Sequence, residues 1–182
     1  MKSDIFHSKQ FDIKSISIPK FELKNGKLIR FYIPDTRIIG FDLTIELIKY
    51  FQTKNKNLPW AKHYDSSSMW RRIYPLTVKS YLVRKHKIDN QVAERIAAEI
   101  GIRLEDKLEH LNHINRKSLV IKALFEKNDF ILIDYYGVDA IGIKKIEHIV
   151  NSEIEKGKKQ LLLMFYNIWR EKNHLKILKE LY

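Results

Sequence analysis

The sequence predicts an α/β fold with a parallel or mixed sheet at its core and a small helical subdomain. Apolar and polar residues alternate over 11–21, which is typical of strands with one buried face. Apolar residues recur at helical spacing in several segments further along the chain. The last part reads strand, helix, strand, helix, and this order indicates a right-handed parallel unit.

The N-terminal part is expected to form strands followed by one helix. Asn25-Gly26 lies between apolar runs and predicts a hairpin turn, with a strand over 28–33 after it. A loop follows, and the apolar spacing over 41–51 then predicts a helix.

The middle of the chain predicts three helices. The first covers 75–86, with Thr77 as its cap, and the second covers 89–100, where Gly101 ends it. The third covers 115–128.

The C-terminal part alternates strands and helices. Apolar runs predict buried strands over 129–136 and 159–167. Helical spacing predicts helices over 141–157, ending at Gly157, and over 168–182.

Composition indicates a single soluble globular domain. The chain has 182 residues, of which 45% are apolar and 31% charged. It contains no cysteine, which excludes disulfides, thiolate metal sites and a cysteine nucleophile. No signal peptide is evident, and no apolar run approaches the ~20 residues that span a bilayer. We therefore expect a cytoplasmic protein.

The net charge of +12 favours acidic partners. Nucleic acid, anionic lipid and an acidic protein face all meet this description. A Lys- and Ile-rich genome would produce the same excess, so charge alone identifies no ligand.

The order of these elements resembles the nucleotide-binding domain of ATP-binding-cassette (ABC) transporters. The phrases that carry the resemblance are "FELKNGKLIRFYIP", "RRIYPLTVKSYL", "AERIAAEIGIRLEDKLEHLNHINRKSLVIKALFEKNDFILIDYYGVDAIGIKKIEHIV" and "KGKKQLLLMFYN", in collinear order along nearly the whole chain. The resemblance implies a P-loop NTPase-like fold of ABC ATPase type in one domain, 1–182. Its α/β core would comprise 1–58 and 111–182, and an abbreviated helical subdomain would cover about 59–110.

The phosphate loop of that family is degenerate in this chain. Such a loop needs Gly-x-x-x-x-Gly-Lys-Ser/Thr, because glycines turn backbone N–H groups onto the phosphates and the lysine neutralises them. The matching stretch has one glycine, no lysine and an added carboxylate, so tight binding of Mg-ATP is not expected. The residues at this place are Pro34, Asp35, Thr36, Arg37 and Gly40.

Three further motifs of the family have lost their functional side chains. The signature is reduced to Leu111 through Asn115, in which Asn112 would cap the next helix. The switch histidine is replaced by Tyr166 or Asn167, and the glutamine loop has no clear glutamine over 66–70.

Two aspartates, one at the end of the apolar run over 130–133 and one in the turn that follows, keep places that the family uses. The resemblance puts Asp134 at the magnesium-coordinating position and Asp139 at the dimer loop. Tyr135 stands where a glutamate would polarise the attacking water, and a phenol with a pKa near ~10 is a poor base at neutral pH.

These losses together remove what phosphoryl transfer depends on: positioning, charge neutralisation and water activation. The resemblance therefore predicts a catalytically inactive ABC-ATPase-like protein with no catalytic residue, no metal and no cofactor. It would act as a non-catalytic partner or regulatory subunit, as in an ABC-type transport complex. An active ATPase or a membrane permease subunit would be its partner. Whether the chain forms a homodimer or a heterodimer stays open.

Two alternatives remain open: a nucleic-acid-binding module, and an ATPase with an atypical phosphate site. The first depends on basic residues interleaved with aromatics over 60–87, which suit base stacking and phosphate contact. The same composition suits an interface with another protein. It also suits a purely structural role, with the aromatic residues in the core and the cations at the edge of that core. The patch comprises Trp60, Lys62, Trp70, Arg71, Arg72, Lys79, Arg84 and Lys85.

His110 and His113, three residues apart, have a spacing that can seat a metal on a helix. No HExxH or similar motif accompanies them, and we predict no metal site.

Overall fold

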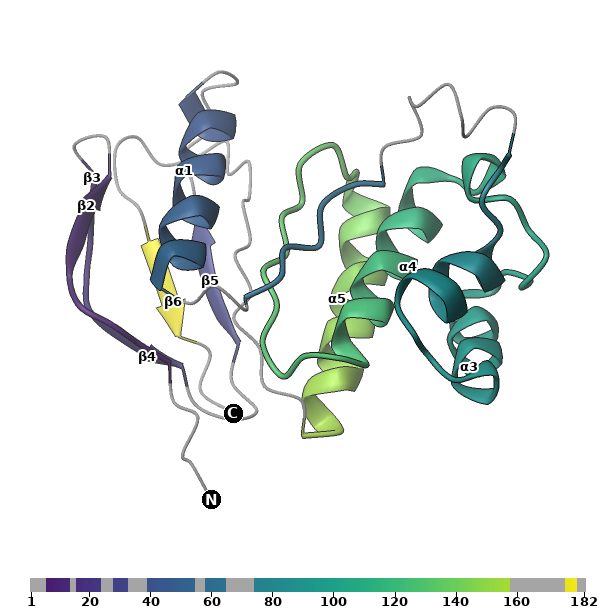
Figure 1. Ribbon diagram of the computed structural model, residues 1–182. Coiled ribbons are helices and arrows are strands. Elements are labelled where there is room, and N and C mark those ends of the chain that lie inside the picture. Colours follow the sequence, from purple (N-terminus) through teal and green to yellow (C-terminus); the bar gives the residue numbers. More distant parts are fainter. Residues whose placement is uncertain are drawn as a thin grey trace. The chain divides into compact units, whose positions relative to one another are not determined.

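The computed structural model describes residues 6–13, 16–23, 28–32, 39–54, 58–64, 74–157 and 176–179 (Figure 1). The chain forms two compact units. Unit 1 contains Met1–Trp60, Asn128–Gly137 and Asn151–Tyr182, and unit 2 contains Ala61–Lys127 and Val138–Val150.

Unit 1 combines short antiparallel strand pairs with one long helix. β1 (Phe6–Ser8) pairs with β4 (Phe21–Leu23), β2 (Phe11–Ile13) with β3 (Ile16–Ile18), and β5 (Ile29–Tyr32) with β6 (Lys176–Lys179). The helix α1 covers Ile39–Lys54 and confirms the helix predicted from the spacing over 41–51.

The core of unit 1 is built on one face of α1. Leu43, Leu47 and Phe51 recur every four residues and are almost wholly buried, as the helical period requires. Phe51 makes ring contacts with Phe21 and Phe31 at centroid distances of 5.8 Å each. The full cluster of buried residues is Ile18, Phe21, Ile29, Phe31, Leu43, Leu47, Ile48, Phe51, Leu58 and Leu132.

Two predictions about unit 1 are wrong. The turn at Asn25-Gly26 lies outside the described residues, and the described strands before and after it do not pair with each other: β4 pairs with β1, and β5 pairs with β6. Residues 176–179, predicted as part of a helix over 168–182, form β6 instead. In both cases a strand partner distant in sequence overrides a local preference.

The parallel sheet is represented by a single pairing in the described residues. Leu132 forms a parallel bridge with Trp60, and its N–H donates to the Pro59 carbonyl oxygen at 2.8 Å. The surrounding segment, Ile131–Tyr135, is buried, as the apolar run predicts, but is extended rather than a regular strand. The mixture of helices and strands is confirmed, whereas the parallel core stays a prediction.

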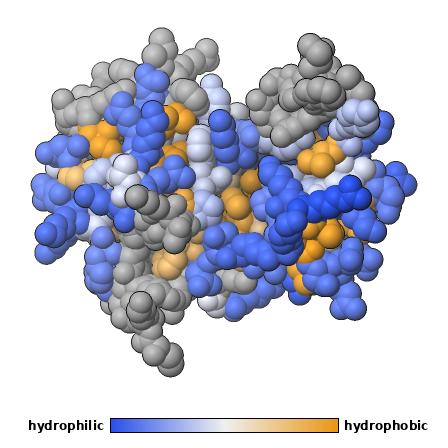
Figure 2. All heavy atoms as spheres, in the orientation of Figure 1, coloured by the Kyte–Doolittle hydropathy of each residue, from blue (hydrophilic) through white to orange (hydrophobic). Residues whose placement is uncertain are grey.

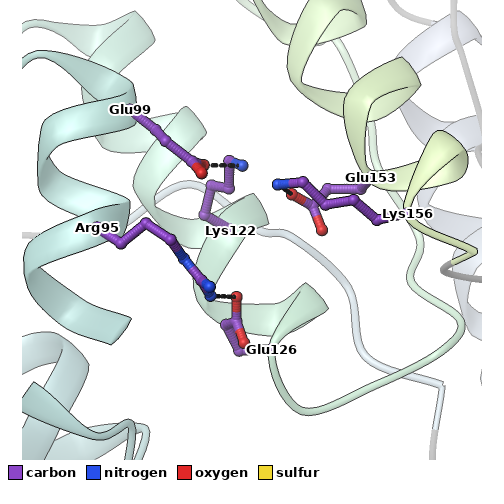
Figure 3. Close-up of polar contacts among 6 residues, drawn as sticks. All are labelled: Arg95, Glu99, Lys122, Glu126, Glu153 and Lys156. Atoms are coloured by element: carbon purple, nitrogen blue, oxygen red, sulfur yellow. Dashed lines mark hydrogen bonds and ion pairs between the residues drawn. The ribbon is translucent and has the colours of Figure 1, made fainter. Parts of the chain in front are cut away.

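Unit 2 is helical among its described residues. Its elements are η1 (Ser80–Lys85), α3 (Asn90–Ile100), η2 (Leu108–His110), α4 (His113–Phe125) and α5 (Ala140–Glu155), of which the part to Val150 belongs to this unit. α3 packs against α4. The packing buries Ile96 and Ile100 of α3, and the two helices are also joined by the ion pairs Arg95–Glu126 and Lys122–Glu99 (Figure 3).

The helix ends of unit 2 follow the sequence signals. Asp89 accepts a hydrogen bond from the Gln91 N–H at 2.8 Å, and Gly101 ends α3 with a φ of 78° that favours glycine. Thr77 Oγ1 accepts from the Ser80 N–H at 3.2 Å, which confirms it as a cap. Asn112 Oδ1 accepts from the Asn115 N–H at 2.8 Å, so its predicted capping role is confirmed too.

No helix within the described ranges is long and apolar enough to cross a membrane. The face drawn in Figure 2 is mostly hydrophilic, with hydrophobic residues exposed between the polar ones.

Candidate functional site

Asp134 is a buried carboxylate of unit 1 that is held by hydrogen bonds. It follows the extended segment that pairs with Trp60, and only 3% of its surface is exposed. The Trp60 indole N–H donates to Asp134 Oδ2 at 2.6 Å, and the Tyr136 backbone N–H donates to Oδ1 at 3.1 Å. Both oxygens of this carboxylate therefore accept hydrogen bonds from the protein itself.

Tyr135, the residue that follows Asp134, is also buried, with 3% of its surface exposed. Its neighbour Tyr136 is 57% exposed. A phenol held inside the protein has little access to a water molecule that it could activate, and its ordinary pKa already makes it a poor base.

Asp139 begins α5 in unit 2. Its Oδ1 accepts from the Gly142 N–H at 2.7 Å, which is the bond of a helix N-cap. Gly142 is required by close packing, since a Cβ there would lie 2.7 Å from Val138 Cγ1 and 2.9 Å from Ile114 Cγ1. The structure supports a capping role for Asp139 in the turn that begins α5. The role of Asp139 in a dimer loop stays a prediction.

Most of the predicted phosphate loop lies outside the described residues, namely Pro34, Asp35, Thr36 and Arg37. Gly40 lies in the first turn of α1. The positions expected for the glutamine loop (66–70) and the switch (Tyr166, Asn167) also lie outside them.

The basic and aromatic patch is only partly described. Trp70, Arg71 and Arg72 lie outside the described residues, while Lys62, Lys79, Arg84 and Lys85 are exposed side chains of unit 2. Trp60 belongs to unit 1 and donates to Asp134 rather than lying free on a surface.

His113 lies beside His63 rather than beside a metal-ligand set. The two rings stack with their centroids 4.1 Å apart, and His110 lies 3.8 Å from the Glu109 carboxylate. Among the residues placed by the structure, no three metal-ligating side chains gather.

His86 closes η1 in a positively charged environment. Its backbone N–H donates to the Tyr81 carbonyl oxygen at 3.2 Å, five residues back, and its ring packs at 4.6 Å from the Tyr81 ring. Burial lowers the pKa of His86 below its usual value, and the charges of Lys85 and Lys127 lower it further. Burial also raises the pKa of Tyr81, and Tyr64 adds to this shift.

We expect the stability of the protein to fall as the pH drops below about 6.5, the pKa of histidine in an unfolded chain. The lowered folded-state pKa means that the unfolded chain binds the proton more readily. Neutral His86 therefore makes its full contribution to the free energy of unfolding at a pH above the pKa of histidine in the unfolded chain. This contribution decreases as the pH falls toward the lower pKa of His86 in the folded state. Urea unfolding at about pH 7.5 and about pH 5.5 should show a smaller difference for His86→Phe than for the wild type. Equal differences in the two proteins would contradict this origin.

Two long-range interactions near these residues were not anticipated from the sequence. The Trp60–Asp134 hydrogen bond joins residues 74 apart, and the charge of Lys127 acts on His86 although the two are distant in sequence. Neither pair has a local spacing signal that could have revealed it.

No protein-family model and no curated protein matches the chain. Solved structures do match. An ABC transporter ATP-binding protein from Pyrococcus furiosus is 10% identical with a TM-score of 0.66, over 91% of this chain and 92% of that one. An ATP-binding subunit of an ABC transporter is 13% identical with a TM-score of 0.54, over 88% of this chain and 79% of that one.

Longer proteins share the same fold over part of their length. The RNase-L Inhibitor is 15% identical with a TM-score of 0.60, over 91% of this chain and 35% of that one. The archaeal ribosome recycling factor aABCE1, solved with the ribosomal stalk protein aP1, has the same identity and TM-score. The chain spans about a third of the length of these two proteins, 35% and 34%. At these identities the likeness concerns the fold alone, and the fold of this chain is similar to that of the ATP-binding domains of ABC transporters.

Proposed function

We propose that the protein is an ABC-ATPase-like module that does not hydrolyse ATP and that serves as a non-catalytic partner or regulatory subunit. The observation that carries this proposal is the burial of Asp134 together with the hydrogen bonds that its carboxylate accepts. In a P-loop ATPase the aspartate at this place holds magnesium. Here it is buried, and both of its oxygens accept hydrogen bonds from Trp60 and Tyr136.

The neighbouring chemistry supports the same proposal. The base expected after Asp134 is a buried tyrosine, and the sequence over 33–40 has no lysine for the phosphates. The proposed inactivity would thus combine three losses: the metal-binding carboxylate, the base and the phosphate-neutralising cation.

The partner that we propose is an active ATPase or a membrane permease subunit, paired with this chain on the cytoplasmic side. The solved relatives include an ATP-binding subunit of an ABC transporter and cbiO1, part of the cbiONQ transporter complex. We further propose a single domain over 1–182, with a core from 1–58 and 111–182 and a helical subdomain over about 59–110.

Mg-ATP is expected to leave the thermal midpoint of the protein unchanged. A ligand present at 100 times its Kd would stabilise the folded state by about 2.7 kcal/mol. For a chain of this size that stabilisation corresponds to a rise of about 5–10 °C. Differential scanning fluorimetry with Mg-ATP, and with Mg²⁺ or ATP alone as controls, measures this directly.

Two results would contradict the proposal of inactivity. One is a rise of the midpoint that requires Mg²⁺ and ATP together. The other is ATP hydrolysis that persists in the purified wild type and disappears in Asp134→Asn, which would favour an ATPase with an atypical site.

A further inference from the structure

Several cations gather at the end of η1, and three of them are exposed and have no ion pair within the described residues. Arg84, Lys87 and Lys127 are exposed and form no ion pair with any residue that the structure describes. In contrast, Arg95 and Lys122, on the α3–α4 pair, are bonded to Glu126 and Glu99 (Figure 3).

The segment that carries most of this charge contains no carboxylate. From Tyr74 to Ile88 the chain contains no Asp or Glu, and Asp89 is engaged in capping α3. Glu126 precedes Lys127, but its carboxylate lies 2.9 Å from Arg95 Nη2. The positive field therefore extends to solvent at this place.

These cations lie close together in the fold. The charges of Lys85 and Lys127 both lower the pKa of His86, so Lys127 lies near the end of η1 although it is distant from it in sequence. Lys85 Nζ also lies 5.0 Å from the centre of the Tyr81 ring. Arg84, Lys85, Lys87 and Lys127 are called the η1 basic end below.

The backbone of this region is unusual as well. Hydrogen bonding in η1 is π-helical, a rare arrangement that is frequent at functional sites. Lys87 has a φ of 55°, and it is the single described non-glycine residue with positive φ. Such a conformation is uncommon for a residue other than glycine. Here it turns the chain directly after three consecutive basic or imidazole side chains, 84–86.

We propose that the η1 basic end binds the phosphodiester backbone of a nucleic acid. Three of its four members are lysines, which are depleted at protein–protein interfaces but contact phosphates readily. The large exposed apolar residues of the described chain are Tyr74, Tyr136 and Ile141, and none of them belongs to the η1 basic end. An acidic protein would need apolar anchors beside the charges, and a membrane would need apolar side chains to insert.

The test uses a fluorescent RNA of about 20 nucleotides, a length that exceeds the footprint of a single small domain. Binding is followed by fluorescence anisotropy at about 50 mM and about 200 mM salt. The test variant combines Arg84→Gln, Lys87→Asn and Lys127→Gln, with asparagine chosen because it tolerates positive φ. The matched control, Lys9→Gln with Lys49→Gln and Lys144→Gln, removes the same charge from other exposed positions.

We expect the wild type to bind with a steep salt dependence. The test variant should bind at least about 10-fold more weakly, and its slope of log affinity against log salt should be smaller by about 2. The control should differ from the wild type by less than about 3-fold. Thermal midpoints of all three proteins show whether folding is preserved.

Three outcomes would overturn the proposal. The first is no binding by the wild type at low salt. The second is an equal loss of affinity in the test variant and the control, which would assign binding to net charge alone. The third is preferential binding to polyglutamate or to phosphatidylserine vesicles that RNA does not displace, which would assign the surface to a protein or a membrane. Because the assay does not involve ATP, its failure leaves the proposed inactivity of the ATPase site unaffected.

Discussion

Replacing Asp134 with alanine is expected to lower the free energy of unfolding by about 2–4 kcal/mol, since hydrogen bonds to a charged group contribute about 1.5–3 kcal/mol each. The substitution removes the acceptor for the Trp60 indole N–H and for the Tyr136 backbone N–H. Both donors would then lie beside an apolar methyl group in a site where Asp134 is 3% exposed. Urea unfolding followed by circular dichroism measures the loss.

Matched variants separate the two hydrogen bonds. Trp60→Phe removes one donor and keeps an aromatic ring, so we expect a smaller loss than for Asp134→Ala. The double mutant should be less destabilised than the sum of the single mutants, with a coupling of about 1–3 kcal/mol. Asp134→Asn keeps one acceptor oxygen and should fall between the wild type and Asp134→Ala. Additivity of Asp134→Ala and Trp60→Phe would show that the bond contributes nothing to folding.

This set of variants bears on function as well as stability. If Asp134 holds the fold rather than a metal ion, its substitution changes unfolding without any change in a nucleotide-dependent property. A variant that loses a Mg-ATP response while keeping its unfolding free energy would reverse that assignment.

Phe51→Ala is expected to cost about 3–5 kcal/mol, the range for removing a buried aromatic ring from a packed core. Phe51 is 0% exposed, and its ring contacts include four aromatic side chains of the described residues. Their centroids lie 5.6 to 6.0 Å away, and the rings are Phe11, Phe21, Phe31 and Tyr50. Deleting the central ring leaves a cavity bordered by groups from α1 and from three strands, which cannot all collapse into it.

Phe51→Leu is the control for volume. It retains an apolar side chain at the same place and should cost less than half as much as Phe51→Ala. Thr53→Ala, on the exposed part of α1, should change stability by less than about 1 kcal/mol. A cost below about 1 kcal/mol for Phe51→Ala would mean that this cluster does not hold unit 1 together.

The helices were largely determined by the sequence. Asp89, Gly101 and Asn112 mark helix ends in the structure as their residue types predict. The apolar spacing of α1 places Phe51 on its buried face. These features follow from the sequence because helical hydrogen bonds and caps join residues only a few positions apart.

The tertiary structure decided how the strands pair and where the polar groups meet. The Asn25-Gly26 signal did not predict that β5 pairs with β6, whose residues begin at Lys176. Local pattern did not predict that Trp60 bonds to Asp134 or that Lys127 lies near His86. A strand or a buried carboxylate can satisfy its hydrogen bonds with any suitably placed partner, and only the packed chain selects which one.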